Sequence, residues 1–225
     1  MLGIFEDIIK HKADYLRAET GEHFEDRFER GLRSNGYSPI LKRDISAADF
    51  SVIKNFIVQK QNVDFLVFKK YPMSFIRGPF GSQNYPDFIV FTEKYVIPVE
   101  IKYSKESQTR PIWNSGIPRA NGVYIFGSYK KGDITFFLGC DVLNKKRRAA
   151  LINFFEEIKA EEKNFKKFAK EKIPDAEKRG FMPYVRRAYD QEKISKDTEL
   201  NYFSHSQRKR LEKNVIAIIQ KLQNK

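Results

Sequence analysis

The sequence predicts an α/β fold in which a mixed central β-sheet is flanked by helices, with a helical C-terminal part. Apolar residues recur three or four positions apart in the first sixty residues and again after residue 144, as on one face of a helix. Between these regions lie short apolar runs of strand length, bounded by turn-forming residues. The order of helices, sheet and helices favours a mixed sheet that is covered on both faces.

The chain of 225 residues suits one domain spanning residues 1–225, because it is long enough to bury a sizeable core. Hydrophobic residues make up 41% of it, including 20 Phe, and such a composition folds rather than staying disordered. No internal repeat, glycine-serine linker or low-complexity tract divides the sequence. We expect the core to span about residues 15–143 and a helical extension to span about residues 144–225.

Two helices are predicted before the sheet. Phe24, Phe28 and Leu32 recur every four positions and give one buried stripe, and the Asn-Gly pair at 35–36 ends that helix. A second helix is predicted from residue 46 to about residue 59. After the sheet, helical spacing of apolar residues predicts one helix beginning near residue 144 and a last helix around residues 211–222.

The sheet is predicted from short apolar runs. Residues 77–84, rich in Gly, Pro, Ser and Asn, are predicted as a loop, and residues 129–133 as a hairpin turn. The predicted strands are 62–68, 88–91, 95–101, 123–126 and 134–138.

The formal net charge is +13, from 42 Lys and Arg against 29 Asp and Glu. This excess favours a polyanionic partner, because each phosphate contact releases condensed counterions. A well-solvated basic surface is the alternative; an anionic membrane is a weaker one, since no predicted helix pairs a basic face with an exposed apolar face. No run of 18 apolar residues is present, so we expect no membrane span. The single cysteine, Cys140, and the acidic N-terminal residues Glu6 and Asp7 favour a cytoplasmic protein without a secretory signal.

Two carboxyl groups and one amine are predicted to meet at one end of the sheet. Asp87 opens one strand and Glu100 closes the next, so a hairpin around residues 92–94 places both at the same end of the ladder, roughly 5 Å apart between opposed Cβ atoms. Glu100 and Lys102 are two positions apart and point to the same face, whereas Ile101 points to the interior. Two close carboxylates repel unless a cation lies between them, and oxygen ligands suit Mg²⁺.

This arrangement resembles the PD-(D/E)XK nuclease superfamily, here as Pro86-Asp87, twelve residues, then Glu100-Ile101-Lys102. The resemblance implies that Asp87 and Glu100 bind Mg²⁺ together with the carbonyl of Ile101, and that Lys102 is the catalytic lysine. The metal would lower the pKa of a bound water, and Lys102 would help to deprotonate or orient that water and counter charge on the phosphate.

A preceding helix supplies a further acid. The first-helix pattern of the superfamily is a Gly, then a Glu four positions later, then an apolar residue, and it fits Gly21, Glu25 and Phe28. The resemblance therefore implies that Glu25 is an outer-shell catalytic acid, although Glu22 and Glu29 share its helix face.

Within the superfamily, the chain looks most like a type II restriction endonuclease, because it is short, basic and without a helicase motif or accessory module. The resemblance implies a Mg²⁺-dependent endodeoxyribonuclease that cuts specific sites in double-stranded DNA and leaves 5′-phosphate and 3′-hydroxyl ends. Palindromic sites match two-fold protein symmetry, so we expect a homodimer. The alternatives are another nuclease of the superfamily, for repair or junction resolution, and a basic DNA-binding protein that does not cut.

Candidates for DNA contact come from the loop before the predicted site and from the long polar stretch 103–121 after it. Gln and Asn amides can pair bidentately with adenine, and long ordered loops in compact domains are often functional. The candidates are Ser82, Gln83, Asn84, Lys105, Arg110, Asn114 and Arg119.

These interpretations have structural alternatives. Asp87 and Glu100 could be surface carboxylates at ordinary hairpin ends. Trp113 could anchor the core, which would leave the stretch 103–121 as a solvated connection.

Three clusters of basic residues could contact phosphate or form solvated faces, and they lie at 145–148, 186–187 and 208–210. Two of them open predicted helices, where cations oppose the helix macrodipole. Phosphate contact explains this placement more easily than helix stability does, and a solvated face remains the alternative.

Overall fold

The computed structural model describes residues 1–17, 21–81, 84–114, 116–172, 182–186, 188–191 and 200–224. Within these residues, seven strands form one sheet. The strands are β1 (Ser38–Pro39), β2 (Leu66–Val67), β3 (Ser74–Arg77), β4 (Phe88–Phe91), β5 (Tyr95–Ser104), β6 (Val123–Ser128) and β7 (Asp133–Leu138). The main spatial order is β1-β3-β4-β5-β6-β7, and β2 pairs with β5.

The sheet is mixed, as predicted. The pairs β1/β3 and β5/β6 are parallel, whereas β2/β5, β3/β4, β4/β5 and β6/β7 are antiparallel. The hairpin of β4 and β5 and the hairpin of β6 and β7 are the two that the apolar runs and turn residues predicted.

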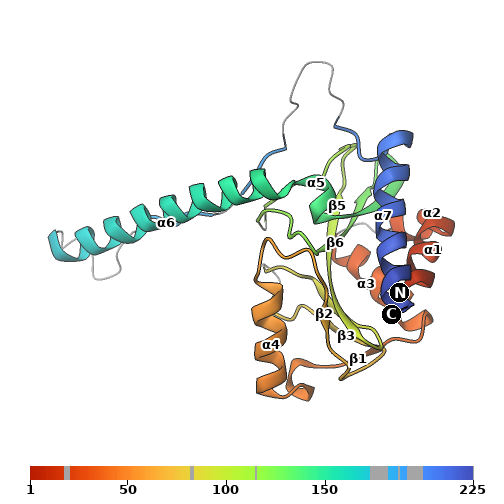
Figure 1. Ribbon diagram of the computed structural model, residues 1–225. Helices are drawn as coiled ribbons and strands as arrows, with labels where there is room; N and C mark the ends of the chain where they lie inside the picture. The colour runs from red at the N-terminus through yellow and green to blue at the C-terminus, as the bar shows by residue number, and fades with distance from the viewer. Residues whose placement is uncertain are drawn as a thin grey trace.

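Helices surround this sheet (Figure 1). The helices are α1 (Leu2–Lys10), α2 (Lys12–Leu16), α3 (Gly21–Ser34), α4 (Ala47–Ile57), α5 (Gly139–Val142), α6 (Lys145–Lys172) and α7 (His205–Gln223), with a 3₁₀ turn at Lys42–Asp44. Both predicted helices before the sheet are present. The turn that follows α3 contains Gly36, whose φ of +83° suits glycine, and the N-cap of α4 is Ser46, whose hydroxyl accepts the Asp49 N–H at 3.1 Å.

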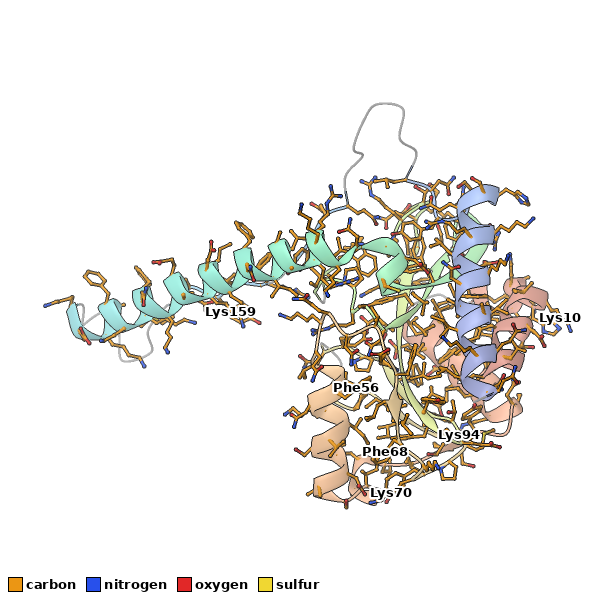
Figure 2. The ribbon with its side chains drawn as sticks, viewed as in Figure 1. Lys10, Phe56, Phe68, Lys70, Lys94 and Lys159 are labelled. Carbon is orange, nitrogen blue, oxygen red and sulfur yellow. The ribbon has the colours of Figure 1, made fainter. Side chains whose placement is uncertain are left out.

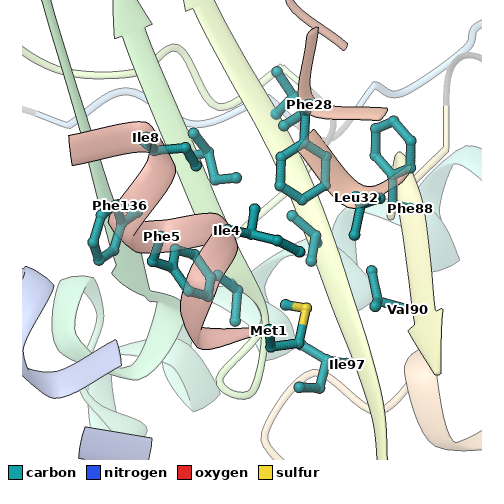
Figure 3. Close-up of a cluster of buried hydrophobic side chains, with 14 of the residues drawn as sticks. Met1, Ile4, Phe5, Ile8, Phe28, Leu32, Phe88, Val90, Ile97 and Phe136 are labelled. Atoms are coloured by element: carbon teal, nitrogen blue, oxygen red, sulfur yellow. The ribbon is translucent and has the colours of Figure 1, made fainter. Parts of the chain in front are cut away.

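Each face of the sheet carries apolar side chains that alternate along the strands. In β4, Phe88 and Val90 face a large cluster that includes residues of α1, α3 and α7, and Figure 3 shows its α1 and α3 side chains. Ile89 and Phe91 face a second cluster that includes Ile53 of α4. A fully buried β4 with alternate residues in different clusters requires cover on both faces, which confirms the predicted fold class.

The core is wider than the expected range of residues 15–143. Ile4, Phe5 and Ile8 of α1 are buried in the main cluster, and so are Val215 and Ile219 of α7. The N-terminal and C-terminal helices therefore belong to the body of the protein. The helical extension is instead α6.

One strand prediction was wrong in part, and one strand was not predicted. The predicted strand 62–68 is reduced to two residues, because the Asn62 side chain accepts the Asp64 N–H at 2.9 Å and forms a local turn instead of a ladder bond. Strand β3 begins before the predicted loop and was not expected. Its four residues give too short an apolar signal, and they are preceded by Tyr71 and Met73 at positive φ.

Helix α6 is predicted by its spacing, but it projects from the body of the molecule (Figure 1). Side chains extend from its projecting part on more than one side, Lys159 among them (Figure 2). Leu151, Phe155 and Ile158 are only half-buried, and Phe168 is exposed. No described helix combines the length and apolar character needed to cross a membrane.

Candidate active site

The antiparallel pairing of β4 and β5 brings the two predicted acids to the same end of the sheet. Phe88 pairs with Val99, so the same register continued by one residue places Asp87 opposite Glu100. The turn at 92–94 is closed by the Thr92 N–H, which donates to the Tyr95 carbonyl at 2.9 Å. The hairpin geometry inferred from the sequence is thus the geometry of the structure.

Two hydrogen bonds tie the groups of this end together. The carboxylate Oδ2 of Asp87 accepts the Ile101 N–H at 2.7 Å, and Lys102 Nζ donates to Glu100 Oε1 at 2.9 Å. Glu100 is 3% exposed and Lys102 is 8% exposed. Ile101 faces the main apolar cluster on the opposite side of the sheet, so the acid and the amine of β5 share one face, as their two-residue spacing predicted.

The electrostatics of Asp87 show that these groups act on one another. Burial and the nearby Glu100 carboxylate raise the pKa of Asp87 to about 7, and Glu25 adds to that rise. The Ile101 N–H and the Lys102 ammonium oppose the rise. The other three side chains that the sequence selected as catalytic therefore all influence the Asp87 carboxyl group, which a scattered set of surface residues would not do.

Glu25 reaches this end of the sheet from α3. Its carboxylate lies 3.3 Å from the Arg77 guanidinium, which also bonds to Asp26 at 2.5 Å and to Glu29 at 3.3 Å. Burial raises the pKa of Glu25, Arg77 opposes that rise, and Glu100 contributes to it. Arg77 was not predicted to have a role. The sequence marks Arg77 only as a single cation at the end of a short apolar run, and its acidic partners on α3 are about fifty residues away in the chain.

The groups that meet here fit a hard divalent cation. Asp87 and Glu100 supply carboxylate oxygens of the kind that Mg²⁺ prefers, and Mg²⁺ needs only one or two protein carboxylates besides water and phosphate oxygens. The Ile101 N–H points toward Asp87, and in a strand the C=O of a residue points to the same side as its N–H, so the Ile101 carbonyl also faces this end. Among the described residues, no group of three His, Cys, Asp or Glu is placed to hold a metal, so such a site would depend on two acids and the carbonyl.

The predicted DNA-contact residues are distributed unevenly. Asn84 is exposed and its amide donates to the Phe80 carbonyl at 2.9 Å. Arg119 donates to the Val58 carbonyl at 3.1 Å, and its guanidinium lies 5.4 Å from the centre of the Tyr85 ring. Ser82 and Gln83 lie outside the described residues.

The other candidates lie on the long connection between β5 and β6, and they are Lys105, Arg110 and Asn114, all exposed. This connection is anchored rather than loose. Trp113 is 3% exposed and packs 5.3 Å from Tyr124, and Thr109 donates to the Leu200 carbonyl at 2.9 Å. Trp113 is therefore a core residue, as the structural alternative held.

Two of the basic clusters contain arginines with structural partners. Arg148 is 1% exposed and donates to three backbone carbonyls, of Pro118 at 3.1 Å, Gly139 at 2.9 Å and Leu143 at 2.5 Å. Arg208 forms hydrogen bonds to Asp133 at 2.8 and 2.9 Å and to Glu212 at 2.9 Å. The expectation of phosphate contact is wrong for these two arginines, because their donors are already used inside the protein.

The third cluster is only partly described. Arg186 is exposed, and its Nε donates to the Asn114 carbonyl at 3.3 Å. Arg187 lies outside the described residues.

Comparison of the chain with models of protein families, with curated proteins and with solved structures gave no match in any of the three.

Proposed function

We propose that this chain is a Mg²⁺-dependent nuclease that hydrolyses phosphodiester bonds of double-stranded DNA at the shared end of β4 and β5. One observation carries the proposal: Asp87, Glu100 and Lys102 meet at one end of the sheet. Asp87 accepts the Ile101 N–H at 2.7 Å, and Lys102 donates to Glu100 at 2.9 Å. Burying paired charges is often no better for stability than burying apolar residues of similar size. A chemical role explains why this sheet end keeps them.

Each residue has a role that its position supports. Asp87 and Glu100, with the Ile101 carbonyl, would hold Mg²⁺. When bound, the ion would lower the pKa of a water molecule and offset charge on the phosphate. Lys102, held by Glu100, would orient the attacking water and counter the charge that develops on phosphorus-bound oxygens. Glu25, positioned by Arg77, would act from outside the ligand set.

The finer proposal is a type II restriction endonuclease that acts as a homodimer in the cytoplasm. The net charge of +13 supports a polyanionic substrate, and the single cysteine, whose pKa is raised by burial, suits a reducing compartment. A homodimer matches palindromic sites.

The test is incubation of purified protein with supercoiled plasmid and Mg²⁺, with EDTA as the control. Site-specific cleavage gives discrete fragments whose sequenced ends share one motif. Cleavage governed by DNA structure or by ends would indicate a repair or junction-resolving nuclease instead. Binding without any cutting would leave a non-catalytic DNA-binding protein.

Matched variants separate the site from general effects of charge. Asp87→Asn and Lys102→Ala are expected to abolish cleavage. Asp14→Asn and Lys10→Ala change the charge by the same amounts at exposed positions of α2 and α1 and are expected to cleave normally. Full activity in both site variants would exclude the assignment.

A further inference from the structure

A basic depression lies beside the candidate active site, on the side of α4. It is lined by Lys42, by Lys54 and Val58 at α4, by residues 79–81 and 84–85 and by Arg119, and it includes the amide of Asn84 and the aromatic ring of Tyr85. Its cations are Lys42, Lys54 and Arg119, and none of the described residues that line it is acidic. Three positive groups around one concave surface make a site for anionic oxygens.

Two of these cations are available to a ligand. Lys42 and Lys54 are exposed, and in the described part of the chain neither forms an ion pair. Lys42 Nζ lies 4.5 Å from the centre of the Phe50 ring, which steadies the amine without neutralising it. These two lysines differ in this respect from Arg148 and Arg208, whose donors are used within the protein.

The basic surface continues toward the base of α6. A second depression shares Val58 with the first and is lined by Lys60 and Lys145, with the amides of Gln59, Gln61 and Asn62. Lys60 lies 3.7 Å from Glu156, whereas Lys145 is exposed. The two depressions, which meet at Val58, are lined by five cations in all, and we name this set the α4 band: Lys42, Lys54, Arg119, Lys60 and Lys145.

The α4 band is next to the proposed cutting site. Tyr85 lines the first depression and is two residues before Asp87 in the chain. Its ring stacks on that of Tyr124 with 6.1 Å between the ring centres, and Tyr124 is the strand partner of Glu100. Helix α4 packs on Ile89 and Val96, so it covers the same face of the sheet that carries Glu100 and Lys102.

We propose that the α4 band binds the phosphate backbone of duplex DNA beside the scissile phosphate. The inference rests on the proposed function, which supplies the duplex and the position of the cut. It assigns the backbone contacts to the five cations of the band. Arg119 is the member shared with the earlier candidates, and Asn84 lines the first depression. Lys105, Arg110 and Asn114 are not part of it.

The test measures how DNA binding depends on salt, in EDTA so that hydrolysis does not interfere. Fluorescence anisotropy of a labelled duplex gives the affinity over a range of KCl concentrations. The variant Lys42→Gln/Lys54→Gln is compared with Lys10→Gln/Lys221→Gln, which removes the same charge from exposed positions on α1 and α7. Thermal unfolding of both variants checks that they fold.

We expect the slope of log affinity against log salt to fall by about two in the first variant, because each lost phosphate contact removes about 0.9. At about 0.1 M salt this corresponds to a loss of affinity on the order of tenfold for each lysine. The control variant is expected to keep the wild-type slope. Equal slopes in both variants would overturn the α4 band.

The two proposals fail in different ways. If the slope falls in Lys42→Gln/Lys54→Gln as expected but the wild type does not cut plasmid with Mg²⁺, the band is supported and the nuclease is refuted. A wild-type protein that cuts, with unchanged slopes in Lys42→Gln/Lys54→Gln, would support the nuclease and refute the band.

Discussion

The shared end of β4 and β5 buries charged side chains, whereas the projecting helix α6 exposes aromatic ones. At the sheet end, Glu100 and Lys102 are 3% and 8% exposed, whereas on α6 Phe154 and Phe168 are 53% and 52% exposed. Burial of charge is costly, and exposure of aromatic rings forgoes hydrophobic stabilisation. The sheet end therefore has a composition that stability alone does not favour.

The stability of the two regions also has different sources. The sheet end is held by long-range pairing of strands and by apolar clusters on both faces. Helix α6 has local ion pairs, such as Lys166 with Glu162 and Lys167 with Glu171 one turn apart, each of which stabilises a helix by a few tenths of a kcal/mol. A change at the sheet end should affect the whole fold and the chemistry, and a change on α6 should affect little beyond the helix.

The largest effect is expected for Lys102→Ala. Its removal should lower the cleavage rate by about 10³-fold or more, and it should also lower the free energy of unfolding by about 3 kcal/mol, because Glu100 loses its partner at 2.9 Å. Cleavage rates and urea unfolding measure the two effects separately. The double variant Glu100→Gln/Lys102→Ala should regain part of the stability and none of the activity. Unchanged stability in the single variant would mean that Lys102 does not stabilise the buried Glu100 carboxylate.

The next effect is expected at the base of α6, where Arg148 joins the helix to the body. Replacement by Met roughly keeps the volume of the side chain but removes the guanidinium donors from the carbonyls of Pro118, Gly139 and Leu143. We expect a loss of about 3 kcal/mol in the free energy of unfolding. Arg147→Met is the matched control, since Arg147 is exposed. A similar loss in both variants would show that Arg148 has no special anchoring role.

The features that could be predicted from the sequence are those that depend on residues close together in the chain. Strand β4 was predicted at its observed bounds, and β5 from its observed start, because an apolar run and a turn are adjacent in the chain. The convergence of Asp87 with Glu100 followed from that hairpin. The role of Arg148 could not be predicted in this way, because one of its acceptors, Pro118, is 30 residues away. Trp113 was ambiguous for the same reason, since its neighbours Tyr124 and Phe137 are brought to it by the sheet.

A smaller effect is expected from pH. The pKa of Asp87 is about 7 in the folded protein and about 4 in an unfolded chain, so the folded state binds more protons between these values. The contribution of Asp87 to the stability of the metal-free wild type should therefore decrease as pH rises from about 4 to 7. Asp87→Asn lacks this decrease and should be more stable than wild type by about 1–3 kcal/mol at pH 8 in EDTA. Thermal unfolding at several pH values measures the difference.

The addition of Mg²⁺ sharpens this prediction. A bound metal needs the ionised carboxylate, so Mg²⁺ should stabilise the wild type more at pH 8 than at pH 6. Asp87→Asn should show little stabilisation at either pH. Parallel pH profiles of the two proteins in EDTA would contradict the raised pKa of Asp87.

The smallest effect is expected for the exposed rings of α6. Phe165 and Phe168 are 47% and 52% exposed, so their replacement by Gln removes little buried apolar surface and keeps residues of good helix propensity. We expect Phe165→Gln/Phe168→Gln to change the free energy of unfolding by less than about 0.5 kcal/mol. In contrast, Phe136→Ala in the main cluster should cost about 3–5 kcal/mol, because its ring is fully buried against Phe5 at 4.7 Å. Urea unfolding compares them directly. A large loss in the α6 variant would mean that its rings are covered in solution, and the contrast between the two regions would then disappear.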